Sequence, residues 1–396
     1  MMRVFLCCLL FLTTTLHSFE GSTDPSKINK PATVKVLLTK LALQAHVEVK
    51  GPFLLYNPHD DSWIAHHAKK KKGKMKVGNR GLIWGKPMKG VDEIRIVPNS
   101  PQTKLFVNGN EYKGCIEIYS IGGTLNIVNE LDVESYLIST LSPQMKTDLN
   151  QEAIDAVVIT ERTSLYSLIG KSAYTSWHLE AEKVGYLGTN QKKESSQVRE
   201  AVSRTSDLVL HFEKKPFPTS WGQDLAGQSA SYRSIFRRKL KAPSGVSRLP
   251  SSLDREKSAW KISFTKKELS ALLNSSSLSS ISLFKAKGTN KVYALRLSTQ
   301  SGPFNLDFFA FQKALGKKSL PSNDFSVEMG KKGIIFTGYG EGNGVGLCLK
   351  SAHRLAEKNE PCPKILQRHF PGAQLVNIRR ERGLEKSHSF IWTQAN

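Results

Sequence analysis

Residues 127–168 read IVNELDVESYLISTLSPQMKTDLNQEAIDAVVITERTSLYSL, and this stretch decides the fold that the sequence predicts. Its first residues continue an alternation of apolar and polar side chains, which is typical of a short strand. Apolar residues then recur at helical spacing until Ser142-Pro143 interrupts them. A second, longer helix is expected from Asn150, its N-cap, to Leu168, with Glu152 placing negative charge in the first turn. Two helices joined by a proline elbow would hold the residues of the elbow rigidly.

Upstream of the elbow, the sequence predicts a β-rich region. Short segments alternate apolar and polar residues, and Asn108-Gly109 is a typical two-residue hairpin turn. The basic run KKKKGK at 69–74 is interpreted as a solvated loop tip, with an anion-binding patch as the alternative. The expected strands lie within residues 33–58, 81–84, 93–97, 105–107 and 115–121.

Downstream of the elbow, a Gly-rich loop is the most distinctive feature. Residues 338–347 read GYGEGNGVGL and lie between an expected strand over 334–336 and an expected helix over 347–357. The glycine spacing fits neither the dinucleotide-binding nor the phosphate-binding-loop consensus. We expect the loop to bring its backbone close to a ligand, or, as the alternative, to pack the two halves of the chain together.

The remaining segments predict mixed secondary structure. The Ser-rich stretch 275–282 is interpreted as a loop or a helix terminus. Helices are expected over 194–204 and 311–315, and strands over 208–212, 292–297, 304–306 and 325–329.

Composition and the N-terminus bound the compartment. The chain has 396 residues and a formal net charge of +23, which favours a polyanionic neighbour such as nucleic acid, anionic lipid or acidic wall polymer. Residues 1–18 combine Arg3 with the apolar run 4–16, which predicts a secretory signal peptide, with an uncleaved anchor as the alternative. Secretion argues against nucleic acid. We therefore expect a protein of the periplasm or cell envelope, without a membrane span after signal removal.

The elbow stretch resembles the SpoIID/LytB family, bacterial envelope proteins that act on peptidoglycan as lytic transglycosylases or amidase enhancers. Residues 129–137, NELDVESYL, are similar to the family's N-E-L-x-x-E-x-Y-L signature, and 141–145, LSPQM, to its V-x-P-x-E-M elbow. Residues 153–163 follow its A-x-x-A-x-x-x-x-x-R-T helix, and 338–349 are similar to its G-x-G-x-G-H-G-V-G-M-S-Q loop. Two departures stand out, because Gln144 replaces the glutamate taken to be the catalytic acid and Asn343 replaces the histidine.

The expected fold is α+β, with a β-rich N-terminal part, a central helical core, and C-terminal strands that carry the Gly-rich loop and help to enclose a groove. This groove would bring Gln144 and Asn343 near each other. The predicted organisation is a signal peptide at 1–18, a linker at 19–30, a β-rich part at 31–126, a helical core at 127–215, a C-terminal part at 216–378 and a basic tail at 379–396.

The resemblance implies a catalytic position at Gln144, whose amide can position a sugar but cannot give or take a proton. Glu130 and Glu161 are the candidates for a substitute acid, with Glu134 and Glu152 also considered. Each of these carboxylates has an alternative role on a helix surface or as a cap. The residues implied for glycan binding are Arg162, Tyr186, Tyr339, Gly340, Asn343, Gly344 and Gly346.

The region 170–188 predicts no metal site. Many relatives carry cysteines and a histidine there that look able to bind zinc, whereas this chain has His178 and no cysteine. One histidine cannot supply a tetrahedral ligand set. We therefore expect neither a metal nor another cofactor.

Three functional hypotheses remain open. The first is a peptidoglycan-binding or remodelling protein that acts on glycan strands in septal or cell-wall processing, with weak or lost lytic transglycosylase activity and a cell-wall amidase as a second partner. The second is an active lytic transglycosylase that uses a displaced carboxylate. The third is a basic, non-catalytic envelope scaffold that contacts anionic polymer or lipid through its lysines.

Overall fold

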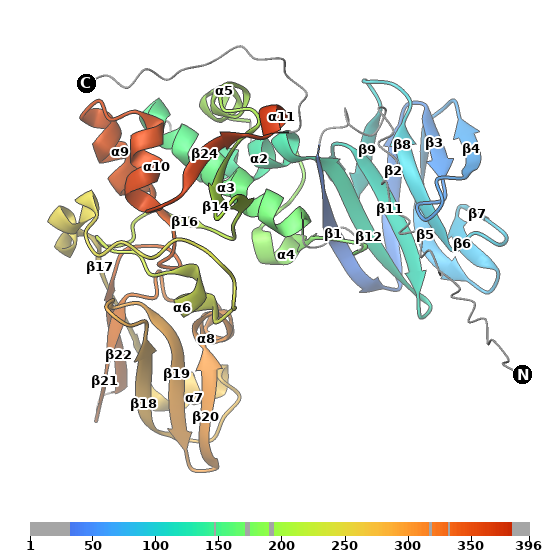
Figure 1. Cartoon of the computed structure of the whole chain (residues 1–396). Coiled ribbons are helices and arrows are strands. Elements are labelled where there is room, and N and C mark those ends of the chain that lie inside the picture. The colour runs from blue at the N-terminus through green and yellow to red at the C-terminus, as the bar shows by residue number, and fades with distance from the viewer. Residues whose placement is uncertain are drawn as a thin grey trace, which may run out of the picture. The chain divides into compact units, whose positions relative to one another are not determined.

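The computed structural model describes residues 32–145, 148–170, 175–189, 194–316, 319–331 and 333–381. The predicted signal peptide and linker, and most of the predicted basic tail, lie outside these residues. Helices and strands are both abundant, and the predicted α+β class is confirmed (Figure 1). Within the described ranges, no helix is long and apolar enough to cross a membrane.

The β-rich N-terminal part forms two sheets that pack face to face (Figure 1). Its strands are β1 (Thr33–Ala42), β2 (Gln44–Lys50), β3 (Phe53–Tyr56), β4 (Trp63–His67), β5 (Lys71–Gly78), β6 (Gly81–Trp84), β7 (Lys86–Pro87), β8 (Glu93–Pro98), β9 (Lys104–Val107), β10 (Asn110–Tyr112), β11 (Cys115–Ile121), β12 (Thr124–Asp132) and β13 (Leu179–Glu180). One sheet has the order β13-β1-β12-β11-β8-β3-β4, and the other has the order β10-β9-β2-β5-β6-β7.

Alternating side chains explain why these strands form. Val34 and Val36 of β1, and Val47 and Val49 of β2, are all buried, while their polar neighbours face outward. A side-chain period of two is what a strand with one buried face requires. The indole of Trp84 lies in the same core and donates a hydrogen bond to the carbonyl of Val47 at 3.3 Å.

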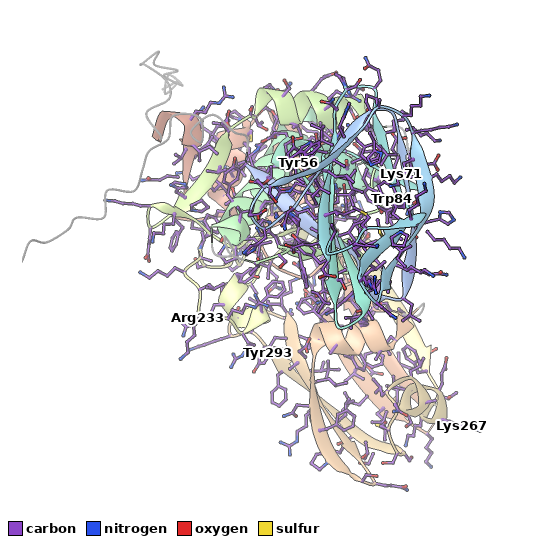
Figure 2. The ribbon with its side chains drawn as sticks, turned by 90° about the vertical axis from the view of Figure 1, so that its right-hand side faces the viewer. Tyr56, Lys71, Trp84, Arg233, Lys267 and Tyr293 are labelled. Carbon is purple, nitrogen blue, oxygen red and sulfur yellow. The ribbon has the colours of Figure 1, made fainter. Side chains whose placement is uncertain are left out.

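The basic run at 69–74 is mostly not a loop tip, so that interpretation was wrong from Lys71 onward. The chain there forms β5, whose Gly73 and Met75 lie on the core side. The ammonium of Lys71 lies over the Trp84 ring, 4.5 Å from its centre, and both residues are marked in Figure 2. Lysines flank the inward-facing Gly73 and Met75, so the sequence there does not show the usual alternation of apolar and polar residues. The outward positions carry the exposed Lys72, Lys74 and Lys76.

The predicted elbow between two helices is confirmed. Helix α2 (Val133–Leu141) begins at Asp132, whose carboxylate accepts from the backbone N–H of Ser135 at 2.8 Å. A 3-10 turn, η1 (Ser142–Gln144), follows. Helix α3 (Gln151–Ile169) begins at the predicted N-cap, Asn150, which accepts from the N–H of Glu152 at 3.0 Å. The next elements are α4 (Ala181–Val184), α5 (Ser196–Arg204), β14 (Leu208–Phe212) and β15 (Lys215–Pro216).

Arg162 connects α3 to the elements around it. Its guanidinium is fully buried and pairs with the carboxylate of Glu134 on α2, at 2.6 Å and 2.9 Å. The same group donates to backbone carbonyls of Val202, Thr205 and Leu208 at 2.8–3.3 Å, in and after α5. Arginine can do this because its planar fork has five N–H donors. One side chain thus holds α2, α3, α5 and β14 in a defined arrangement.

The C-terminal part contains two three-stranded sheets around an aromatic core. One sheet has the order β17-β22-β21 and the other β18-β19-β20, and Phe264, Phe311, Phe325 and Phe336 are buried between elements of this part. The elements are β16 (Trp221–Gly222), α6 (Tyr232–Phe236), η2 (Pro250–Asp254), η3 (Glu256–Ser258), β17 (Ala259–Phe264), α7 (Lys266–Leu272), β18 (Leu278–Lys285), β19 (Val292–Thr299), β20 (Gly302–Asp307), α8 (Phe308–Ala314), β21 (Phe325–Gly330) and β22 (Gly333–Tyr339).

The Ser-rich stretch 275–282 was interpreted wrongly, because most of it lies in β18. Leu278 is buried, Ile281 packs against the aromatic core, and serines occupy the exposed positions between them. Small polar side chains on the outer face of a strand disturb neither the ladder nor the core. Low complexity therefore concealed an ordinary half-exposed strand.

The end of the described chain returns to the central helices. After the Gly-rich loop come β23 (Leu347–Cys348), α9 (Leu349–Glu357), α10 (Cys362–His369), β24 (Gln374–Asn377) and α11 (Ile378–Glu381). Helices α9 and α10 pack against α3, and β24 pairs antiparallel with β14. The central part is therefore closed by residues that lie far from it in the sequence.

The Arg162→Lys variant should lower the free energy of unfolding by about 2–4 kcal/mol, because lysine keeps the charge but lacks the fork that reaches both Glu134 and the carbonyls. Urea unfolding followed by circular dichroism measures this loss. The control is Arg199→Lys, which alters an exposed pair with Glu194 and should cost about 0–1 kcal/mol. Equal effects of the two variants would contradict the connecting role of Arg162.

Candidate functional site

The elbow presents Gln144 at the surface. Pro143 lies at the start of η1, and Gln144 ends this turn with an exposed side chain. Its Nε2 donates to the carbonyl of Thr140 at 2.6 Å, which turns the amide back toward α2. The carbonyl of Gln144 accepts from Nε2 of Gln223 at 3.1 Å. The acid position implied by the resemblance is thus accessible and tied to the C-terminal part.

The Gly-rich loop is held against the segment that follows residue 219. Strand β23 pairs in parallel with β16, and the amide of Asn343 donates to Oγ of Ser220 at 2.6 Å. Gly346 has a φ of +80°, and a Cβ there would lie 2.0 Å from the carbonyl oxygen of Ser220. Only glycine tolerates both the backbone conformation and this approach. The packing alternative for the loop therefore has direct structural support at Gly346.

Residues 220–223 connect the elbow with the Gly-rich loop. Ser220 bonds Asn343, whereas Gln223 bonds Gln144, and the carbonyl of Gln223 also accepts from the N–H of Lys350 at 3.1 Å. The structure thus brings Gln144 and Asn343 to opposite ends of one short segment. That both line a common groove remains a prediction.

Tyr339 and the loop glycines have different surroundings. Tyr339 is half-buried, and the guanidinium of Arg255 lies over its ring at 4.2 Å from the centre. Gly340 and Gly344 are buried, and the carbonyl of Gly344 accepts from the N–H of Ala230 at 2.8 Å. Of the residues implied for glycan binding in this loop, Tyr339 and Asn343 are the half-buried ones with side chains.

A buried cluster of charged side chains lies next to the Gly-rich loop, and its residues were not among those predicted from the sequence. Lys291 is 1% exposed and donates from Nζ to the carboxylate of Asp324 at 2.9 Å and to the carbonyl of Leu225 at 2.7 Å. Arg255 also pairs with Asp324, at 2.7 Å and 3.0 Å. Burial alone would raise the pKa of Asp324, but its bonds to the two cations lower that pKa below the ordinary value. Residue type alone does not distinguish a buried charged side chain from an exposed one, so this cluster could not be predicted from the sequence.

Arg162 and Tyr186 lie in the core rather than at a surface. Arg162 is fully occupied by Glu134 and backbone carbonyls, and Tyr186 is 2% exposed. The hydroxyl of Tyr186 donates to Oδ1 of Asn129 at 2.7 Å, and its ring contacts that of Tyr136 at 5.5 Å between centres. Their contribution to glycan binding would be indirect, through the position of the elbow.

Three of the four candidate carboxylates have internal partners. Glu134 pairs with Arg162, and Oε2 of Glu152 accepts from the N–H of Cys362 at 2.6 Å. Glu130 accepts from Oγ1 of Thr33 at 2.7 Å and lies 3.8 Å from the cationic nitrogens of Lys35 and Arg95. The same two cations bond Glu117 more closely, in a network on β1, β8, β11 and β12. These carboxylates have evident roles in holding the structure together.

Glu161 differs from the other candidates. It is half-buried on α3, and within the described part of the chain it has no hydrogen-bond or ion-pair partner. Burial raises the pKa of its carboxyl to about 7. Burial and then the nearby charge of Glu161 raise the pKa of Tyr136 on α2. A carboxyl that titrates near neutral pH is suited to general acid–base chemistry.

His178 has a structural position. Its backbone N–H donates to the carbonyl of Lys35 at 2.8 Å, and its ring Nδ1 accepts from the backbone N–H of Lys35 at 2.9 Å. These bonds place β13 beside β1. Burial lowers its pKa below the ordinary value. In the ranges that the structure describes, no three His, Cys, Asp or Glu side chains are arranged to hold a metal ion.

The segment 220–230 contributes side chains that could not be assigned to the site from the sequence. It supplies Ser220 and Gln223, and also Asp224, whose carboxylate pairs with Nζ of Lys350 at 2.8 Å. The sequence there keeps only small and polar character, so no spacing pointed to it. The available signal was a weak resemblance of residues 218–222 and 224–229 to the family's polar H-S-x-x-G-G stretch, which would help line a glycan cleft.

Comparison with known proteins agrees with the placement of the elbow. Residues 122–212 match the family model SpoIID, described as stage II sporulation protein. This segment runs from β12 through the elbow and α3 to β14. The resemblance to the SpoIID family is therefore confirmed for the central part, which carries a SpoIID domain.

Three relatives are uncharacterized proteins. One from Chlamydia muridarum (strain MoPn / Nigg) is 35% identical over 179 residues, which cover 45% of this chain and 62% of that protein. One from Chlamydia pneumoniae is 31% identical over 179 residues, covering 45% of this chain and 65% of that protein. One from Brachyspira hyodysenteriae (strain ATCC 49526 / WA1) is 25% identical over 354 residues, covering 88% and 94%. This chain thus spans less than two thirds of the two chlamydial relatives.

The Glu161→Gln variant should be more stable than the wild type at pH 8 by about 1–3 kcal/mol, since it no longer buries an ionised carboxylate. Folding raises the pKa from near 4.5 to about 7, so wild-type stability falls as pH rises across this window and levels off above it. The difference should shrink toward zero as pH approaches 4. Urea unfolding between pH 4.5 and 8 measures it, with the exposed Glu200→Gln as control. A pH-independent difference would contradict the raised pKa.

Proposed function

We propose that this protein binds and remodels peptidoglycan outside the inner membrane, in the periplasm or cell envelope, with lytic transglycosylase activity that is weak or lost. The SpoIID domain at 122–212 supports an envelope role, because the family it resembles acts on peptidoglycan. Glycan strands are the proposed partner, and a cell-wall amidase is a second one. Nucleic acid is not proposed as a partner.

The observation that carries this proposal is the exposed amide of Gln144 at the elbow. Cleavage of a glycosidic bond needs a proton on the leaving oxygen, and a positioned acid contributes about 10²–10⁴-fold to the rate. A carboxamide can accept and donate hydrogen bonds to a sugar, but it cannot transfer that proton. The elbow would then keep its role in binding while the acid step is missing.

A second candidate function rests on Glu161. Its half-buried carboxyl, with a pKa of about 7 and no partner in the described chain, is the one candidate that fits an acid for an active lytic transglycosylase. In this alternative, the carboxyl donates its proton to the leaving oxygen and then accepts the proton of the sugar's 6-hydroxyl as the anhydro ring closes. Glu161 lies on α3 rather than at the elbow, so the sugar would have to reach that helix.

The Gln144→Glu variant should gain lytic activity of about 10²-fold or more over the wild type, because it restores a carboxyl at the exposed elbow. The assay incubates purified glycan strands with each protein and measures anhydro-muropeptides by mass spectrometry. Gln300→Glu, at an exposed turn distant in sequence, is the matched control and should not change the yield.

Two results would redirect the proposal. Wild-type product that disappears in Glu161→Gln would establish the second candidate function instead. A Gln144→Glu protein that is retained on insoluble peptidoglycan but forms no more product than the wild type would show that the elbow is not the acid position.

A further inference from the structure

Positive side chains are concentrated just after the Gly-rich loop's partner segment. Lys241 pairs with Glu213, and the guanidinium of Arg237 lies over the Tyr293 ring, 4.9 Å from its centre. Arg233, Arg238 and Lys239, nearby, have no carboxylate partner within the described ranges of the chain. The cluster, in and after α6, consists of the exposed residues Arg233, Arg237, Arg238, Lys239 and Lys241.

The residues of the cationic cluster line two adjoining hollows that are open to the surface. Their volumes are about 400 Å³ and 310 Å³, and both are lined by Ser231, Arg233 and Lys239. Arg237 and Arg238 also line the smaller hollow, and Lys241 lines the larger one together with its partner Glu213. Several cationic side chains therefore line the two hollows, and the carboxylate of Glu213 lies beside Lys241 in the larger one.

A rigid aromatic base holds the cationic cluster in place. The ring of Phe236 stacks on Tyr232 at 4.3 Å and on Phe309 at 5.1 Å between centres. Ile235 is buried against Val345 of the Gly-rich loop in the same packing cluster. In Figure 2, Arg233 and Tyr293 mark this region of the molecule. This packing fixes the backbone from which the cationic side chains extend, which favours binding.

The backbone at Arg237 adds a second indication. This residue ends α6 with a φ of +54°, in the left-handed region that favours glycine. A non-glycine residue in this conformation is strained, and such positions concentrate at functional sites. Glycine would suit the backbone at this position, whereas arginine adds a cation to the cluster.

The charge pattern indicates what the hollows would hold. Cations brought close together repel one another, and an anion between them removes this cost. Guanidinium forks match the oxygens of a phosphate, and lysine adds a point charge. One carboxylate would leave most of the positive charge uncompensated, whereas two linked phosphate groups suit two hollows that share Arg233 and Lys239.

We propose that these two hollows form a binding site for a ligand with two linked phosphate groups. The site adjoins the Gly-rich loop, because Ala230 bonds Gly344 and the next residue, Ser231, lines both hollows. The ligand's source is either a soluble pyrophosphate compound or the phosphate headgroups of a lipid surface, which share this chemistry. The proposal does not depend on any lytic activity.

Isothermal titration of the full chain with inorganic pyrophosphate tests the site. The double variant Arg233→Gln/Arg237→Gly should weaken binding about tenfold or more, through the loss of charge-assisted hydrogen bonds. Glycine suits the backbone at position 237, so folding should be preserved, and thermal unfolding checks this. The matched control is Lys74→Gln/Lys76→Gln, which removes two exposed charges from β5 and should change binding less than about twofold.

A second arm uses vesicles of phosphatidylcholine with and without phosphatidylglycerol. Arginine-dependent binding to anionic vesicles that exceeds binding of pyrophosphate would identify lipid headgroups as the source, and the reverse would identify a soluble compound. The proposal is overturned if neither probe binds, or if both double variants reduce binding equally. It is also overturned if the arginines matter only for retention on purified peptidoglycan, which would assign the site to carboxylates.

Discussion

The buried guanidinium of Arg162 is the interaction on which the central part depends. Taking an arginine out of water is costly unless every donor finds a partner, and here Glu134 on α2 and carbonyls at Val202, Thr205 and Leu208 supply them. These partners lie on separate elements, so all of them must be in place together. The angle between α2 and α3, and hence the elbow at Gln144, follows from this requirement.

The residues on which the resemblance to the SpoIID family rests divide into a buried set and an exposed position at the elbow. Arg162, Glu134, Asn129 and Tyr186 are bonded to one another or to the backbone in the interior. Gln144, by contrast, is exposed; its amide donates to the carbonyl of Thr140, and its own carbonyl accepts from Gln223. A substitution at Gln144 therefore leaves the buried set undisturbed. Resemblance of sequence across this segment reports how the elbow is built, and it says much less about what chemistry the elbow performs.

Local sequence signals predicted the helices and strands, but contacts between segments distant in the sequence could not be predicted from such signals. Pro143 and the N-cap Asn150 indicated the elbow, because both act through neighbouring backbone groups. The strand at Lys71–Gly78 was missed because its inward Gly73 and outward lysines break the usual apolar alternation. The pairing of β14 with β24, and the larger hollow beside Arg233, which residues 212–213 line together with residues 231–242, depend on segments that meet only in the fold. The role of residues 220–223 in the candidate site likewise depends on long-range contacts, with Asn343 and Gln144.

The environments of the carboxylates bear on where acid chemistry could survive. Glu130 and Glu117 share Lys35 and Arg95, so their charge is balanced and their position explained by stability. Glu161 has no cationic partner among the described residues. Burial raises its pKa to about 7, so an ionised carboxylate there weakens the fold. A residue that conflicts with its surroundings, without a compensating contact, is the kind that function retains. Any remaining acid function is therefore better sought on α3, beside Tyr136, than among the paired carboxylates of the β-rich part.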